Sequence, residues 1–311
     1  MMLSETFDLF LPRVTLSVDD VKLALMAVDT SKGPGPDGLP PLFLKQCSAT
    51  LALPLTIILN SSLTSGVFPH AWKHASITPI HKCGNLNSVE NYRGISVLSS
   101  ISKVFEKIVH YLLYSAVRHV ISDYQHGFVK KRSTVSNLMC FVTNVLKRIE
   151  KRQQVDAIYI DFSKAFDKVP HMLAVEKMKR LGMPEWITNW LLSYLTGRTA
   201  SVHVLGSHSY CFPIPSGVPQ GSILGPLIFV LFSNDICDSI ASEKLLYADD
   251  LKIFRTIASV SDGNALQHDV DSILHWCLVN GMEVNTDKCY IISFSRLRSP
   301  QHFTYRINEK K

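Results

Sequence analysis

The spacing of hydrophobic residues predicts helices over most of the first half of the chain. Apolar residues recur near helical spacing in residues 18–30, and a Gly/Pro cluster at residues 32–41 must end that helix. Further helices are predicted at residues 42–65, interrupted at Pro54, and at residues 101–120 and 136–151. The first 150 residues are therefore expected to be mostly helical.

The pattern changes at residue 155, where a β-branched run predicts a strand over residues 155–160. The elements predicted after it are helices at 171–181 and 184–195, strands at 201–205 and 210–214, a helix at 221–235, strands at 244–247 and 251–254, a helix at 263–279 that ends at Asn280-Gly281, and a strand at 289–294. This order predicts an α+β fold in which an antiparallel sheet carries helices on one face.

Composition indicates a globular protein that folds as one body with subdomains. The chain has 311 residues, of which 46% are hydrophobic and 19% charged, and it contains no internal repeat or Gly/Ser-rich linker. The formal net charge of +6 is compatible with a polyanionic partner but does not establish one. Seven scattered cysteines without a C-x-x-C pair indicate a reducing compartment, with no disulfide framework and no zinc site.

Targeting signals are not expected from the sequence. The first ten residues have no basic region before an apolar run, so no signal peptide is predicted. The longest apolar stretches, residues 51–59 and 223–232, fall short of about 20 residues and contain Pro, so no membrane span is predicted.

Three aspartates carry the most informative chemistry in the sequence. Asp161 follows the predicted strand at 155–160, and Asp249 and Asp250 are adjacent between two predicted strands. Adjacent carboxylates repel each other unless a cation compensates them, and Mg²⁺ prefers such hard oxygen ligands. If the strand ends lie side by side, the three acids can bind two ions about 3.5–4 Å apart, as in phosphoryl transfer. The alternative is that Asp-Asp forms an ordinary hairpin turn, since Asp favours turns.

A Gly/Pro-rich segment at residues 215–226 lies between the acids. Gly217 and Gly221 flank Pro219-Gln220 just before a predicted helix, where glycine permits close approach of the backbone to a ligand. The N-terminus of the helix favours an anion such as a phosphate. The alternative is a plain turn that enters a helix.

The segments FSKAFD (162–167), SGVPQGSILGP (216–226) and YADD (247–250), in this order, resemble reverse transcriptases. The resemblance is to the polymerase domain of non-LTR (LINE-type, jockey-like) retrotransposons, and it extends over about residues 20–295. The other segments that carry it are K-x-G-P-D-G at 32–38, WKHASITPIHK at 72–82, NYRGISVLSSISKV at 91–104, QHGF at 125–128 with RST at 132–134, and NGM at 280–282 with Asn285 and Lys288.

The resemblance implies roles for individual residues. Asp161, Asp249 and Asp250 match catalytic carboxylates that bind two Mg²⁺ ions, with Mn²⁺ as a possible substitute, and Phe162 would add a backbone carbonyl. Phe166 matches a steric gate against the ribose 2′-OH. The residues implied in binding the incoming dNTP or its leaving group are Arg93 and Lys82 at the triphosphate, Gln220 and Gly221 at the nucleotide and template base, and Lys288 as a general acid.

The same resemblance implies a right-hand polymerase. The expected division is a helical N-terminal extension at 1–61 and a reverse transcriptase domain at 62–311. Within the latter we expect fingers at 62–154 and a palm at 155–311, with a fingers insertion near 171–214. The chain is expected to stop before the thumb. The implied partners are an RNA template, a DNA primer and dNTPs, without a membrane. An intracellular, nuclear location follows from the resemblance alone, and the sequence leaves the oligomeric state open.

Two other functions remain open at this point. One is a related RNA-directed RNA polymerase, against which YADD and the bulky Phe166 argue. The other is a non-catalytic remnant that binds nucleic acid, which the expected lack of a thumb favours. An assay that compares rNTPs with dNTPs distinguishes the RNA polymerase from the DNA polymerase. An assay that compares binding with extension distinguishes the non-catalytic remnant from either enzyme.

Overall fold

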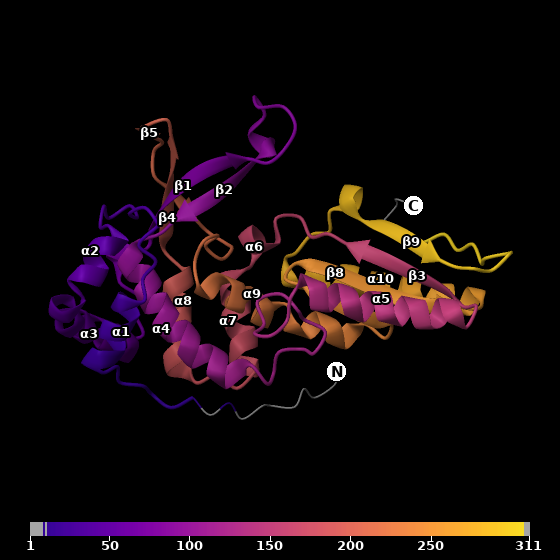
Figure 1. The fold of residues 1–311 in the computed structure, drawn as a ribbon, viewed down its shortest axis with the longest axis horizontal. Coiled ribbons are helices and arrows are strands. Elements are labelled where there is room, and N and C mark those ends of the chain that lie inside the picture. The colour runs from indigo at the N-terminus through magenta and orange to yellow at the C-terminus, as the bar shows by residue number, and fades with distance from the viewer. Residues whose placement is uncertain (1–8, 10, 308–311) are drawn as a thin grey trace. The chain divides into compact units, whose positions relative to one another are not determined.

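The computed structural model describes residue 9 and residues 11–307, and the contacts among them divide the chain into two compact units (Figure 1). Unit 1 contains the chain up to residue 120 together with residues 171–228, and unit 2 contains residues 121–170 and the chain from residue 229. The segment at 171–228 therefore packs with the N-terminal part. Residues 1–8 and 10 lie outside the described residues. The prediction that the first ten residues are not a signal peptide falls mostly on these positions.

Helices are the main regular elements of unit 1. They are α1 (Val18–Met26), α2 (Pro41–Gln46), α3 (Ser48–Ser65), α4 (Ser100–Val117), α7 (His171–Arg180) and α8 (Glu185–Leu195), with short 3₁₀ turns η1 (His70–Trp72) and η2 (Val89–Asn91). Phe68, Phe105, Trp190 and Tyr194 are buried and stack edge-on or in parallel between α4 and α8. Aromatic burial therefore joins α8 to the earlier helix α4.

The helix interruption predicted at Pro54 lies at Cys47 in the structure. Helix α3 continues through Pro54, and the chain breaks at Cys47, the single residue between α2 and α3. Proline removes one backbone donor from a helix interior. Helix α3 buries Ala52, Leu55 and Leu59, and this packing offsets the missing hydrogen bond.

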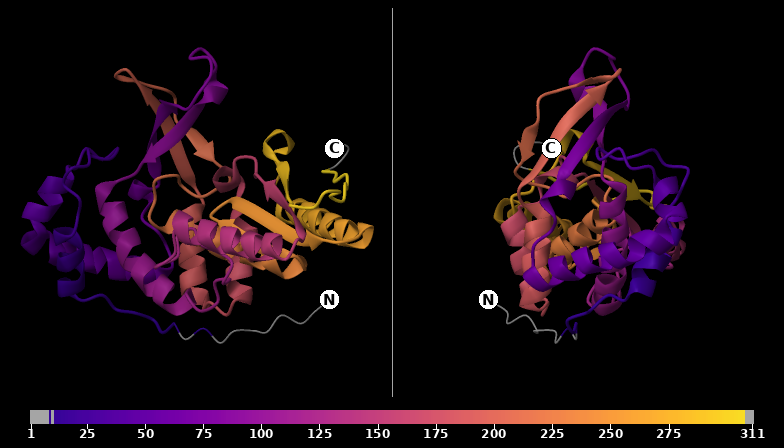
Figure 2. Two further views of the ribbon diagram at one scale, coloured as in Figure 1. Left: turned by 45° about the vertical axis from the view of Figure 1, so that its right-hand side comes forward. Right: turned by 90° about the vertical axis from the view of Figure 1, so that its left-hand side faces the viewer.

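A five-stranded mixed sheet belongs to unit 1, and its strands β1 and β2 are elements that the prediction of a mostly helical first 150 residues missed. Its strands are β1 (His74–His81), β2 (Tyr92–Val97), β4 (Arg198–Val204), β5 (Ser207–His208) and β6 (Phe212–Ile214). The predicted antiparallel hairpin near residues 201–214 is confirmed, but β4 pairs with both β5 and β6. Figure 2 shows the β1–β2 hairpin beside β4 and β5.

Pro79 explains why β1 is hard to recognise in the sequence. Proline lacks an N–H for the ladder and argues against a central strand. Strand β1 pairs in parallel with β4 over His74–Ile77, and Pro79 lies beyond that register, opposite Gly94 of β2. The missing donor therefore removes no bond to β4.

Unit 2 is built on a four-stranded antiparallel sheet in the order β7-β8-β3-β9. The strands are β3 (Gln154–Ile160), β7 (Glu243–Tyr247), β8 (Asp250–Ile257) and β9 (Tyr290–Phe294), which confirms the four strands predicted there. The helical elements around them are α5 (Thr134–Glu150), α6 (Ala165–Lys168), α10 (Val260–Asn280), η3 (Asn234–Ser239) and η4 (Thr286–Lys288). Helix α9 (Leu224–Phe232) crosses from one unit to the other along the chain.

Helices cover both faces of this sheet, which corrects the prediction of helices on one face. Phe141 and Val145 of α5 pack against Val155 and Ala157 of β3 and against Phe254 of β8. Successive side chains of a strand point to opposite faces. Arg255, next to Phe254, accordingly lies toward α10, with its Nε 4.0 Å from Asp262 Oδ1.

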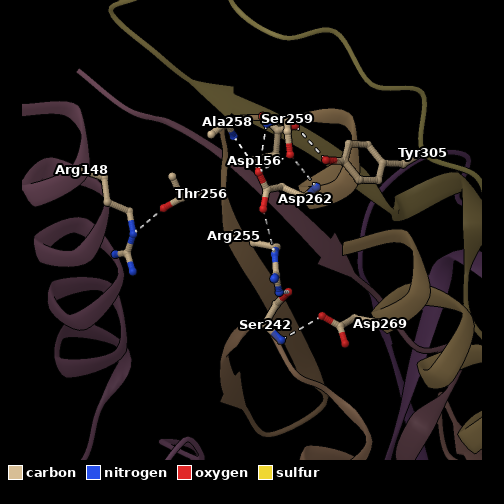
Figure 3. Close-up of polar contacts among 10 residues, drawn as sticks. All are labelled: Arg148, Asp156, Ser242, Arg255, Thr256, Ala258, Ser259, Asp262, Asp269 and Tyr305. Atoms are coloured by element: carbon tan, nitrogen blue, oxygen red, sulfur yellow. Dashed lines mark hydrogen bonds and ion pairs between the residues drawn. The ribbon is translucent and has the colours of Figure 1, made fainter. Parts of the chain in front are cut away.

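Polar contacts join α10 and the C-terminal segment to the sheet (Figure 3). The Tyr305 hydroxyl donates to Asp156 at 2.9 Å, and the Ser242 N–H donates to Asp269 at 2.9 Å. Burial, followed by the nearby Asp156 charge, raises the pKa of Tyr305. The predicted C-cap of α10 is confirmed, since Gly281 has a φ of 65°.

None of the helices in the described part of the chain combines the length and apolarity that a bilayer crossing needs. The mixed α/β architecture agrees with the coarse fold class predicted from the sequence. Helix α9 begins at Leu224, three residues later than predicted, because residues 217–222 form a loop with its own contacts.

Candidate active site

Asp249 lies in a two-residue turn between β7 and β8. Tyr247 and Asp250 form the last pair of this antiparallel ladder, so Ala248 and Asp249 form the turn itself. Ala248 has a φ of 57°, in the left-handed region that a residue with a Cβ rarely adopts. The adjacent acids are therefore presented by a backbone whose conformation the surroundings must impose.

Asp161 directly follows β3, whose last residue Ile160 pairs with Leu251 of β8. Continuing this register places Asp161 across from Asp250, at the same edge of the sheet. The Asp161 carbonyl accepts a hydrogen bond from Asn285 N–H at 2.8 Å, and Phe162 pairs with Val284 in an antiparallel bridge. Tertiary pairing therefore brings together two acids that are distant in the sequence.

The electrostatics of this edge reflect the proximity of the two acids. Burial, and then the charge of Asp161, raises the pKa of Asp250, while Lys252 opposes the shift. Burial lowers the pKa of Lys252, whose Nζ lies 4.5 Å from the centre of the Phe141 ring. Lys288 Nζ lies 4.0 Å from Asp161 Oδ2.

A cleft of about 680 Å³ opens on the α5 face of the sheet beside these acids. Its lining combines Asp161 and Asp250 with two lysines and three tyrosines, Lys252, Lys288, Tyr159, Tyr247 and Tyr290. Tyr159 and Tyr290 stack with their ring centres 4.7 Å apart. The cleft thus offers carboxylates, cations and aromatic surfaces within one unit.

Hard oxygen donors at this edge fit a divalent cation by their chemistry. Asp161 and Asp250 face each other across paired strands, and their mutual repulsion is what a bound cation would relieve. Over residue 9 and residues 11–307, however, no three His, Cys, Asp or Glu side chains are grouped closely enough to bind a metal ion. The third carboxylate, Asp249, is partly buried in the turn.

Phe166 lies on the short helix α6 in unit 2. Its ring stacks on Phe229 with 4.4 Å between ring centres and meets Phe128 edge-on at 6.1 Å. The side chain is half-buried, so part of it remains accessible. The predicted role as a steric gate stays a prediction.

Arg93, Lys82, Gln220 and Gly221 all lie in unit 1. Arg93 is exposed on β2, opposite Ile80 of β1, and Lys82 follows β1, where its N–H donates to Asn91. The two cations therefore lie near one end of the same hairpin, on accessible side chains suited to an anionic ligand.

The loop that contains Gln220 and Gly221 is fixed against β2 and α4. Ser96 N–H donates to the Gln220 carbonyl at 2.9 Å. Gly221 has a φ of 108°, and a Cβ there would lie 2.5 Å from the Ser96 carbonyl oxygen. Only glycine fits this approach of two backbones.

The sequence predicts that the N-terminus of α9 favours an anion, and in the structure a carboxylate of the chain itself lies there. The Glu106 carboxylate accepts hydrogen bonds from Ile223 N–H at 2.7 Å and Leu224 N–H at 3.4 Å. Glu106 is fully buried, and burial raises its pKa while these N–H groups and Arg198 oppose the shift. The Glu106 carboxylate, and not a ligand phosphate, therefore accepts the hydrogen bonds of the N–H groups at the start of this helix.

Sequence reasoning missed the supporting roles of Glu106 and of Gln125. Glu106 stood within an amphipathic helix, where one acid among Val104, Phe105 and Val109 was a signal of burial. Gln125 belongs to the QHGF segment, to which the sequence assigns no role. In the structure its buried amide contacts the backbone of the Ala248 turn.

A family model described as reverse transcriptase (RNA-dependent DNA polymerase) matches residues 80–305. The chain belongs to the reverse transcriptase family.

Two curated relatives are named as RNA-directed DNA polymerases from a mobile element and a transposon. The chain is 31% identical over 305 residues to the RNA-directed DNA polymerase from mobile element jockey of Drosophila melanogaster, covering 94% of this chain and 33% of that protein. It is 32% identical over 290 residues to the probable RNA-directed DNA polymerase from transposon BS of the same fly, covering 89% and 32%. The chain thus spans about a third of the length of these relatives.

Proposed function

We propose that this chain carries the fingers and palm of the RNA-directed DNA polymerase of a non-LTR retrotransposon. Its substrates would be an RNA template, a DNA primer and dNTPs. The observation that supports this most directly is the strand register, which sets Asp161 across from Asp250 beside a cleft. Unit 2 would act as the palm, and the β1–β2 hairpin of unit 1 as part of the fingers.

The chemistry is attack of the primer 3′-OH on the α-phosphate of a dNTP, with departure of pyrophosphate. Asp161, Asp249 and Asp250, with the Phe162 carbonyl, would hold two Mg²⁺ ions, which Mn²⁺ could replace. Bound there, the ions would stabilise the attacking and leaving oxygens. The turn and the end of β3 contribute by fixing the positions of the carboxylates before substrate arrives.

The remaining site residues act on the nucleotide. Arg93 and Lys82 would bind the triphosphate through charge-assisted hydrogen bonds. Gln220 and Gly221 would border the nascent base pair. Lys288 has an exposed side chain, 58% accessible, that can turn from Asp161 toward pyrophosphate and donate a proton. A nuclear site of action is proposed because copying would take place at chromosomal DNA.

Primer extension tests the proposal directly. The purified chain would receive a DNA primer annealed to an RNA template, Mg²⁺ and dNTPs, beside Asp249→Ala and Asp161→Ala variants. We expect extension by the parent and a loss of at least about 10³-fold in both variants, because several kcal/mol of transition-state stabilisation disappear. Asp271→Ala, which changes an exposed acid of unit 2, is the control and should retain activity.

The same assay separates the rival functions. Extension with rNTPs in preference to dNTPs would identify an RNA polymerase instead. Binding of the hybrid without extension at any Mg²⁺ concentration would identify a non-catalytic remnant. Phe166→Val should raise rNTP use relative to dNTP use, and an unchanged ratio would remove the gate from the proposal.

A further inference from the structure

We infer that Gln125 is a positioning residue that fixes the Ala248-Asp249 turn, and with it the two acids that follow Tyr247. The inference deepens the proposed function and rests on it for the catalytic meaning of Asp249 and Asp250. The contact itself is a feature of unit 2, independent of that function.

The Gln125 side chain joins the turn through both halves of its amide. Its Oε1 accepts hydrogen bonds from Ala248 N–H at 3.0 Å and Gly127 N–H at 2.7 Å, and its Nε2 donates to the Ala248 carbonyl at 3.3 Å. The side chain is 3% exposed, so water does not compete for these groups. A primary amide is the side chain that can pair with both polar groups of one residue in this way.

Backbone contacts bring the amide to this place. Residues 124–126 run beside β7, since Leu246 N–H donates to the Tyr124 carbonyl at 2.9 Å and His126 N–H donates to the Leu246 carbonyl at 2.8 Å. Arg132 binds the Gln125 carbonyl at 2.7 Å and the Ser122 carbonyl at 3.0 Å. Gln125 thus forms a single parallel β-bridge with Leu246, and its side chain reaches the turn.

Gly127 shows how closely this segment approaches the turn. A Cβ at Gly127 would lie 2.1 Å from the Ala248 nitrogen. No side chain can occupy that space without moving the backbone of one partner. Gly127→Ala is therefore a second route to displacing the turn, one that leaves Gln125 intact.

The conformation of Ala248 explains why the turn requires a partner. A non-glycine residue at a φ of 57° is strained and persists where neighbouring groups determine its conformation. The dihedral angles of Ala248 set the directions of Asp249 and Asp250. A turn released from Gln125 would sample other angles, and the carboxylates would lose their fixed spacing.

Gln154 provides a matched control in the same sheet. Its side chain is 1% exposed, and its amide makes three hydrogen bonds, to Asp156 Oδ1 at 2.9 Å, to the Gln301 carbonyl at 2.8 Å and from Gln301 N–H at 2.7 Å. It begins β3, at the opposite end of the strand from Asp161. Gln125→Leu and Gln154→Leu therefore remove equal numbers of hydrogen bonds from equally buried sites.

The first experiment measures primer extension by both variants in the full chain. We expect Gln125→Leu to lower kcat by roughly 10- to 100-fold, because small displacements of catalytic groups have effects of that size. The KM for dNTP should change by less than about twofold, and the Mg²⁺ concentration for half-maximal rate should rise. Gln154→Leu should match the parent in kcat and in Mg²⁺ dependence at a temperature where each variant is folded.

Two further readouts do not depend on activity. Hydrogen exchange at the Ala248 amide should accelerate at least about tenfold in Gln125→Leu, because its acceptor has gone. Binding of Mn²⁺, followed by electron paramagnetic resonance, should weaken in Gln125→Leu and in Gly127→Ala but not in Gln154→Leu. If Gln125→Leu does not fold, Gly127→Ala and Gln125→Glu, which retains an acceptor, take its place.

The outcomes separate the two hypotheses. An inactive parent with fast Ala248 exchange in Gln125→Leu would reject the proposed function and retain the contact. Equal kcat, Mn²⁺ binding and Ala248 exchange in parent and Gln125→Leu would overturn the inference. Losses of equal size in Gln154→Leu would also overturn it, because they would reflect general destabilisation.

Discussion

Two backbone segments that carry proposed site residues are anchored in different ways. In unit 1, the buried carboxylate of Glu106 binds the N–H groups that follow the Gln220-Gly221 loop. In unit 2, the neutral amide of Gln125 binds both polar groups of Ala248. A carboxylate only accepts, so it suits a helix start with several free donors, whereas an amide suits a turn that presents a donor and an acceptor.

The difference also concerns charge. Glu106 lies beside the Arg198 guanidinium and the positive end of α9, which partly compensate the burial of its charge. A carboxylate in place of Gln125 would add a negative charge next to the turn that bears two acids. Glu106 can carry a charge because it lies near Arg198 and a helix N-terminus, whereas a neutral amide suits position 125 because it contacts a turn that bears acids.

The largest expected effect is on folding stability at the charged anchor. Glu106→Leu should lower the free energy of unfolding by about 3–5 kcal/mol, because it leaves two N–H groups buried without their acceptor and the buried Arg198 without the nearby negative charge. Gln125→Leu should cost about 1–3 kcal/mol, the penalty for unsatisfied neutral groups. Urea unfolding of both variants measures the difference, and equal losses would remove the distinction between the anchors.

Gly221 should show that the unit 1 loop depends on close backbone approach as well as on Glu106. Gly221→Ala should cost at least about 2 kcal/mol, since the new Cβ meets both strain and the Ser96 carbonyl. Gly206→Ala is the matched control: Gly206 has a φ of 81° with nothing within 4 Å of a Cβ, so strain alone should cost about 1 kcal/mol. Indistinguishable melting temperatures for the two variants would contradict the prediction.

A smaller effect should appear in the dependence of stability on pH. The pKa of Glu106 is raised above its ordinary value of 4.5, so its contribution to stability is fully present below pH 4.5 and is lost as pH rises through the raised pKa. Glu106→Gln should lack this loss and therefore gain on the parent as pH rises. Thermal unfolding of the parent and of Glu106→Gln from pH 4.5 upward measures how stability changes with pH. Gln125→Leu is the control, and its stability should change with pH as that of the parent does.

The smallest effect is expected from the ion pair between Arg132 and Asp123. The two side chains are 2.8 Å apart, but that of Asp123 is 92% exposed. Asp123→Ala should therefore cost less than about 1 kcal/mol and leave primer extension unchanged. A larger loss would show that the surface ion pair is needed to hold Arg132, and with it the segment beside β7, in place.

Local patterns in the sequence were sufficient for the strands of unit 2 and for the three acids, because β-branched runs and turn residues act over a few positions. They failed at β1, where Pro79 disguises a strand whose partner β4 follows much later in the chain. They also failed at Pro54, where packing of α3 outweighs the helix-breaking tendency of proline. The resemblance to reverse transcriptases supplied roles for Arg93, Lys82, Phe166 and Lys288, which the contacts leave as proposals.

The sequence alone determined the order of the motifs, the family and the presence of acids at strand ends, since each is encoded in short segments. Tertiary structure decided the antiparallel register that sets Asp161 across from Asp250. It also decided the contacts of Gln125 with the Ala248 turn and of Glu106 with the start of α9. Gln125 and Ala248 are 123 positions apart, and Glu106 and Ile223 are 117 apart. Contacts of such separation leave no periodic trace in the sequence, because they depend on how whole elements pack.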